Sequence, residues 1–130
     1  MKNKNILLVG GCGFIGHNLA LKLKEKGYKV SVVDSLAVNN LLSFTDNSIV
    51  NKNIYRSILN KRIELLNAKK IDLHIEDARN YHAISKLYDY IKPDIIVHLA
   101  AVSHANKSNK DPHSTFDHSL RTLENTLDFQ

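Results

Sequence analysis

The chain opens with two short apolar runs separated by a segment of different hydrophobic period. The first run, Asn5 to Val9, leads into glycines and therefore predicts a buried parallel strand. From Phe14 onward, apolar residues recur every four positions between charged ones, which predicts an amphipathic helix that ends at Gly27. The second run, Lys29 to Val33, predicts another strand, closed by Asp34. The opening segment is therefore one strand–helix–strand unit.

The same alternation continues through the rest of the chain. Residues 35–50 are rich in Asn and Ser and predict a loop, whereas 51–70 predict a helix. A strand over 71–75, a helix from about Tyr81 to Ile91 and a strand over 94–99 follow. After a polar loop comes a last helix with an apolar face. This face consists of Phe116, Leu120, Leu123 and Leu127. We expect most of it to pack against the sheet, with a homodimer contact as the alternative.

Strands that alternate with helices predict an α/β fold. The expected architecture is a Rossmann-type, doubly wound parallel sheet, because right-handed crossovers place helices on both of its faces. About four strands are present, so the sheet is expected to be incomplete. Residues 1–130 form a single domain in this interpretation.

Composition excludes several other classes of protein. The fractions of hydrophobic residues, 43%, and charged residues, 24%, are those of an ordinary globular domain. No apolar run is long enough to cross a bilayer and no signal peptide is recognisable, so we expect a cytoplasmic protein without membrane contact. The net charge of +5 forms no dense basic stripe, which argues against nucleic-acid binding. Cys12 is the only cysteine and the histidines lack paired ligand spacing, so no metal site is expected.

Three glycines between the first strand and the first helix form a candidate phosphate loop. Gly10, Gly13 and Gly16 are spaced three residues apart. Their expected tasks are a tight turn, close approach of the backbone to a phosphate, and close packing of helix on strand. The free N–H groups and the positive dipole end of the helix then face a pyrophosphate.

An acidic residue closes the second strand. Asp34 follows Gly16 by eighteen residues, and its carboxylate can accept hydrogen bonds from both adenosine-ribose hydroxyls. The same charge repels a 2′-phosphate, which favours NAD over NADP as cofactor. The alternative is that Asp34 only caps the following turn. Because a strand, a helix and an acid surround the glycine pattern, it is more specific than glycine spacing alone.

The chain resembles the extended short-chain dehydrogenase/reductase family, in particular its NAD-dependent nucleotide-sugar epimerases and dehydratases. The glycine loop G-G-C-G-F-I-G has that family's G-x-x-G-x-x-G form. Three further stretches are similar: V-V-D-S-L at 32–36, E-D-A-R-N at 76–80 and I-V-H-L-A-A at 96–101. The resemblance extends from the first strand to the last helix.

The resemblance implies a set of contacts to NAD. Phe14 and Ile15 would offer main-chain N–H groups to the pyrophosphate, and Asp77 would accept from the adenine amino group. The implied cofactor-binding residues are Gly10, Gly13, Phe14, Ile15, Gly16, Asp34, Ser35, Leu36, Asn39, Asp77, Ala78, Leu99, Ala100, Ala101 and Ser119. Ser119 departs from the family pattern, because the family's N-V-x-G-T reads S-L-R-T-L here.

The resemblance assigns no catalytic residue to this chain. Enzymes of the family use a Tyr-x-x-x-Lys pair and a Ser or Thr, and we expect these and the substrate-binding part beyond residue 130. Tyr88 and Lys92 match the spacing, but they end a helix that leads into a strand. They are therefore expected at the sheet edge opposite the cofactor, and His98 is interpreted as a packing residue.

The leading functional hypothesis is the NAD-binding portion of a nucleotide-sugar epimerase or dehydratase. In the full-length protein, NAD would transiently oxidise a hydroxyl of a nucleotide-sugar substrate. The alternative is a non-catalytic nucleotide-sensing or interaction module with the same fold, since fold alone does not fix function.

Overall fold

The computed structural model describes residues 3–37, 51–102 and 109–129. Its elements are β1 (Asn5–Val9), α1 (Phe14–Glu25), β2 (Lys29–Asp34), α2 (Lys52–Ala68), β3 (Asp72–Ile75), α3 (Tyr81–Ile91), β4 (Ile95–His98), α5 (Pro112–Phe116), the π-helical turn η2 (Asp117–Arg121) and α6 (Thr122–Leu127). These elements alternate as the hydrophobic pattern predicted, and no predicted strand end differs from the observed one by more than one residue.

The strands form a single parallel sheet in the order β3-β2-β1-β4. Leu7 in the middle of β1 pairs with Ser31 of β2 on one side and with Ile96 of β4 on the other. This order is the first half of the doubly wound 3-2-1-4-5-6 arrangement, so the predicted fold class is confirmed. The winding reverses direction between β1 and β4, and such a switch point opens a crevice at the carboxyl ends of these strands.

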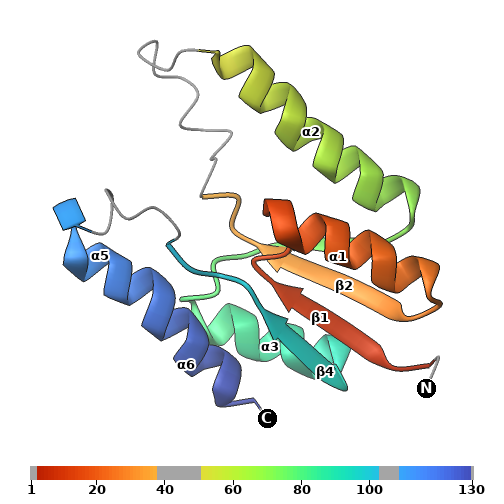
Figure 1. Ribbon diagram of the computed structural model, residues 1–130. Coiled ribbons are helices and arrows are strands. Elements are labelled where there is room, and N and C mark those ends of the chain that lie inside the picture. The colour runs from red at the N-terminus through yellow and green to blue at the C-terminus, as the bar shows by residue number, and fades with distance from the viewer. Residues whose placement is uncertain (1–2, 38–50, 103–108, 130) are drawn as a thin grey trace.

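Helices cover both faces of the sheet (Figure 1). α1 and α2 lie on one face, and α3 and the α5–α6 segment lie on the other. Successive strand side chains point to opposite faces, so Leu8 packs toward Leu66 of α2, whereas Leu7 packs toward Ile84 of α3. Because both faces are buried, the strands read as nearly continuous apolar runs.

The Tyr-x-x-x-Lys match lies at the amino-terminal edge of the sheet. Tyr88, in the second half of α3, is buried in the core, and Lys92 is the C-cap of this helix in a left-handed conformation, with φ 47°. The side chain of Asn5, the first residue of β1, donates to Ile91 O at 3.2 Å. The prediction that this pair lies at the sheet edge opposite the carboxyl ends of the strands is therefore confirmed.

The apolar face of the last helical segment does not pack on the sheet, so that prediction was wrong. Phe116, Leu120, Leu123 and Leu127 are 63%, 54%, 38% and 54% exposed. The opposite face is buried because hydrogen bonds hold it. Thr126 Oγ1 lies 3.0 Å from His98 Nδ1, and Asn125 Nδ2 donates to Ala78 O at 2.9 Å. The homodimer alternative stays a prediction.

Candidate functional site

A cavity of about 520 Å³ opens at the carboxyl ends of the strands. Its volume is within the range of about 300–1,000 Å³ that is usual for small-molecule sites. The cavity lies at the switch point, where β1, β2 and β4 end. Predicted residues that line it are Gly10, Gly13, Phe14, Ile15, Gly16, Asp34, Ser35, Leu36, Asp77, Ala78, Leu99, Ala100 and Ala101.

One predicted residue cannot be placed relative to the cavity, and another, Ser119, is not among the described residues that line it. Asn39 lies outside the described residues. Ser119 lies in η2, and its Oγ accepts a hydrogen bond from Val102 N at 3.2 Å. In the structure Ser119 therefore holds the segment that follows β4.

Gly10 and Gly16 are required by the fold itself. Gly10 has φ +78°, and a Cβ there would lie 2.6 Å from Ala100 N. A Cβ on Gly16 would lie 2.5 Å from Gly11 Cα. The first glycine thus permits a left-handed turn against the end of β4, and the second lets α1 approach the loop closely.

Gly13 is different, because nothing within the described protein requires a glycine there. Its φ of −64° and ψ of 176° are open to any residue, and a Cβ would meet only Gly10 O, at 3.6 Å. Gly13 is the N-cap of α1, where the first main-chain N–H groups of a helix have no acceptor within the helix. A bare backbone at this position leaves those N–H groups accessible from the cavity.

Asp34 both lines the cavity and caps the following turn. Its Oδ2 accepts from Cys12 N and its Oδ1 from Leu36 N, each at 2.8 Å. Burial raises the pKa of Asp34, and these two hydrogen bonds oppose the rise. An ionised carboxylate has about four lone-pair positions, so capacity for ligand hydroxyls remains. The two interpretations of Asp34 are therefore compatible.

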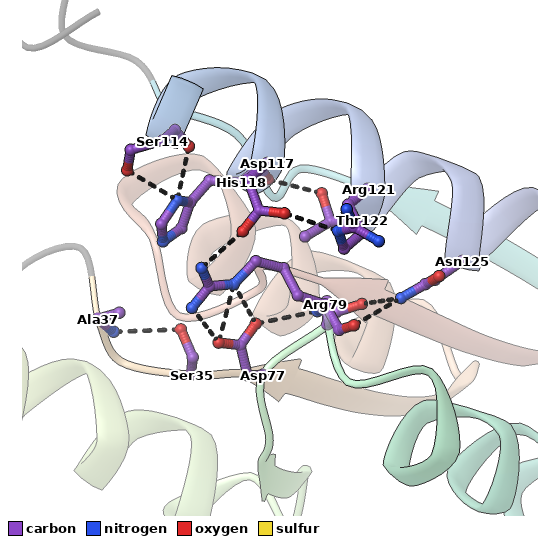
Figure 2. A network of polar contacts seen from close by, with 11 residues as sticks. Ser35, Ala37, Asp77, Arg79, Ser114, Asp117, His118, Arg121, Thr122 and Asn125 are labelled. Carbon is purple, nitrogen blue, oxygen red and sulfur yellow. Dashed lines mark hydrogen bonds and ion pairs between the residues drawn. The ribbon is translucent and has the colours of Figure 1, made fainter. Parts of the chain in front are cut away.

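A network of charged residues fixes Asp77 on the other side of the cavity (Figure 2). Arg79 donates from Nη2 to Asp77 Oδ2 at 2.6 Å and from Nη1 to Asp117 Oδ2 at 3.0 Å. Hydrogen bonds from Arg79 lower the pKa of Asp77, so its carboxylate stays ionised at neutral pH. Asn125 Nδ2 donates to Ala78 O and Arg79 O, which ties the loop after β3 to α6.

Sequence reasoning missed several residues of the cavity wall. Leu59, Arg62 and Ile63 contribute from α2, and His118 and Thr122 contribute from the segment η2–α6. The spacing of the first three residues puts them on one side of a helix, which the sequence shows. Which loop that side faces depends on how α2 packs, and the sequence pattern carries no signal for it.

Other kinds of site find little support within the described residues. In residues 3–37, 51–102 and 109–129, no helix has the length and apolar character that a bilayer span needs. Across those same ranges, no cluster of three His, Cys, Asp or Glu side chains is arranged to hold a metal ion. Burial, followed by the charge of Asp34, raises the pKa of the Cys12 thiol to about 12, which makes it unreactive. Burial also lowers the pKa of His98, the last residue of β4, whose side chain contacts Thr126 of α6.

Comparisons with known proteins agree with this geometry. The sequence model described as "NAD dependent epimerase/dehydratase family" matches residues 6–129. A bifunctional UDP-glucose 4-epimerase and UDP-xylose 4-epimerase of Arabidopsis thaliana is 30% identical over 120 residues, which are 90% of this chain and 30% of that protein.

Solved structures with the same fold include two UDP-glucose 4-epimerases. The enzyme from Stenotrophomonas maltophila, with bound NAD, has a TM-score of 0.72 at 24% identity over 97% of this chain and 33% of that one. The enzyme from Thermotoga maritima, with UDP-glucose, has a TM-score of 0.67 at 26% identity over 96% and 34%. The chain thus spans roughly a third of the length of the proteins it matches.

Proposed function

Because the chain belongs to the NAD-dependent epimerase/dehydratase family, we propose that its cavity binds NAD and that the chain is the NAD-binding portion of a nucleotide-sugar epimerase or dehydratase. Gly13 carries this proposal. A glycine that neither backbone strain nor protein packing requires is explained by a ligand that approaches the main chain closely.

The cavity offers a separate group for each part of the cofactor. Main-chain N–H groups of Phe14 and Ile15 at the start of α1 suit the pyrophosphate, since the helix dipole favours an anion there. Asp34 suits the adenosine ribose, and Asp77 suits the adenine amino group. The segment directly after β4 gives the cavity an apolar wall that suits the nicotinamide ribose, formed by Leu99, Ala100 and Ala101.

In the whole protein, NAD when bound would accept a hydride from the carbon that bears a hydroxyl of a nucleotide sugar, and would later return it. The described residues of this chain bind and orient the cofactor and shield one side of it from water. We assign none of them a proton-transfer role.

Titration calorimetry tests the cofactor assignment. We expect the folded chain to bind NAD, and we expect Asp34→Ala to weaken that binding by about 1–3 kcal/mol, because charge-assisted hydrogen bonds to ribose are lost. Asp89→Ala removes the same charge from the exposed surface of α3 and should bind NAD like the parent chain. Absence of heat with NAD from folded protein, or unchanged binding by Asp34→Ala, would overturn the proposal.

The raised pKa of Asp34 predicts opposite pH trends for binding and for stability. The ionised carboxylate accepts the ribose hydroxyls, so NAD affinity should fall as the pH is lowered through the raised pKa. A carboxyl whose native pKa exceeds the unfolded one stabilises the fold below the unfolded pKa, and this contribution is lost as the pH rises through the native pKa. Between these two pKa values, acidification should therefore strengthen the ligand-free fold while it weakens NAD binding.

Measurements of NAD affinity and urea unfolding against pH check this expectation. The difference between the parent chain and Asp34→Asn isolates the contribution of this carboxyl from those of the other acidic groups. An identical pH dependence of NAD affinity in both proteins would show that Asp34 does not titrate against the ligand.

A further inference from the structure

One side of α2 forms a wall of the cavity. Leu59, Arg62 and Ile63 line it, at helix positions i, i+3 and i+4. The helix lies on the same face of the sheet as α1, and Leu66 anchors its later part in the core. On this side of the helix the cationic Arg62 lies between two apolar side chains, Leu59 and Ile63. Arg62 is the only Lys or Arg among the described lining residues.

Arg62 lies beside the same loop residue that binds Asp34. Arg62 Nη1 donates to Cys12 O at 3.4 Å, and Cys12 N donates to Asp34 Oδ2 at 2.8 Å. The main chain of Cys12 thus contacts an anion through its N–H and a cation through its carbonyl. Both charged side chains line the cavity.

The guanidinium keeps capacity for a ligand. Arginine has five N–H donors, and within residues 3–37, 51–102 and 109–129 no carboxylate forms an ion pair with Arg62. The planar arrangement of these donors matches two oxygens of a phosphate. The pKa of the Cys12 thiol responds to both neighbours, since after burial Asp34 raises it and Arg62 lowers it. Opposite charges therefore act at one point of the glycine loop.

We propose that Arg62 is a specificity-determining residue that opposes Asp34 at the adenosine ribose and so sets how strongly a 2′-phosphate is rejected. The inference depends on the proposed dinucleotide function. Asp34 alone accepts the ribose hydroxyls and repels a phosphate at the 2′ position. Arg62 supplies the opposite charge from α2, so the site discriminates less sharply between NAD and NADP than Asp34 alone would dictate.

The ratio of dissociation constants for NADP and NAD tests the inference. We expect Arg62→Gln to raise this ratio at least about tenfold, because a charge-assisted contact available only to the 2′-phosphate is removed. Lys61→Gln is the matched control, since it removes the same charge from the preceding residue of α2. The side chain of Lys61 is 67% exposed and pairs with Glu64. This control should leave the ratio unchanged. Adenosine 2′,5′-bisphosphate and 5′-AMP give the same comparison without the nicotinamide half.

Each outcome of this experiment has a distinct meaning. If Arg62→Gln weakens NAD and NADP equally, or if Lys61→Gln changes the ratio as much, the inference is overturned. Arg62→Lys keeps the charge without the planar fork, and an intermediate ratio for this variant supports the inference if Arg62→Gln fails to fold. A ratio for Arg62→Lys like that of the parent, together with a raised ratio for Arg62→Gln, shows that the charge of Arg62 rather than its planar fork sets the discrimination, and this result also supports the inference. A folded parent chain that binds none of these nucleotides rejects the proposed function instead.

Discussion

Gly13→Ala is expected to weaken NAD binding by about 1–3 kcal/mol, the usual penalty of inserting a methyl group into a well-packed contact. Among the described residues outside its chain neighbours, the added Cβ meets no atom closer than Gly10 O at 3.6 Å, so we expect the new methyl group to conflict with a ligand on the loop. The fold should not suffer. Because φ at Gly13 is −64°, alanine fits without strain and gains about 0.4–1 kcal/mol from a stiffer unfolded chain. Gly13 is also the N-cap of α1, where alanine is less favourable than glycine by a similar amount, so stability should stay close to that of the parent chain.

Calorimetric titration with NAD and thermal unfolding of the ligand-free chain measure these two effects. The combination of weaker binding and undiminished stability is specific to a glycine kept for a ligand. A variant that binds NAD like the parent chain would refute close approach of the pyrophosphate at this position. A variant that unfolds readily would instead show a structural role.

Gly16→Ala is expected to have the opposite effect on stability. Gly16 lies in the first turn of α1, where alanine would ordinarily favour the helix by about 1 kcal/mol. The Cβ of alanine would lie 2.5 Å from Gly11 Cα and 2.6 Å from Gly11 O, and backbone atoms cannot move aside cheaply. We therefore expect a loss of about 1–3 kcal/mol or more in the free energy of unfolding.

Urea unfolding of Gly16→Ala and Gly13→Ala side by side gives a matched comparison, because both variants add one methyl group to the same loop. The predicted order of stability places Gly13→Ala close to the parent chain and Gly16→Ala well below it. If Gly16→Ala were as stable as the parent, helix α1 could not be packed against Gly11 as closely as the structure shows.

The local sequence pattern was sufficient for the elements and for the centre of the site. The apolar runs that became β1 and β2 are separated in sequence by a single helix, α1, which returns the chain to the same edge of the sheet. This short unit brings Gly13 and Asp34 together almost without reference to the rest of the chain. The glycine loop and the acid at the end of β2 could therefore be predicted from residue type and spacing.

The positions of the other charged residues of the site depend on contacts between segments that are far apart in the sequence. Arg62 and Cys12 are 50 residues apart, and Arg79 and Asp117 are 38 apart. A helical period shows which residues share a side of α2, but the wall that this side forms depends on the packing of α2 beside α1.

The prediction for the last helical segment was wrong for the same reason, because its orientation depends on contacts with distant segments. Its apolar residues, Leu120 among them, were expected to pack on the sheet but are exposed. Thr126 and Asn125 face the sheet instead, because they form hydrogen bonds with His98 of β4 and with the loop after β3. The sequence by itself determined the strands, the helices and the glycine loop, because these depend on neighbouring residues. Tertiary structure alone decided which helix faces reach the cavity, because burial and hydrogen bonding between elements far apart in the chain outweigh local periodicity.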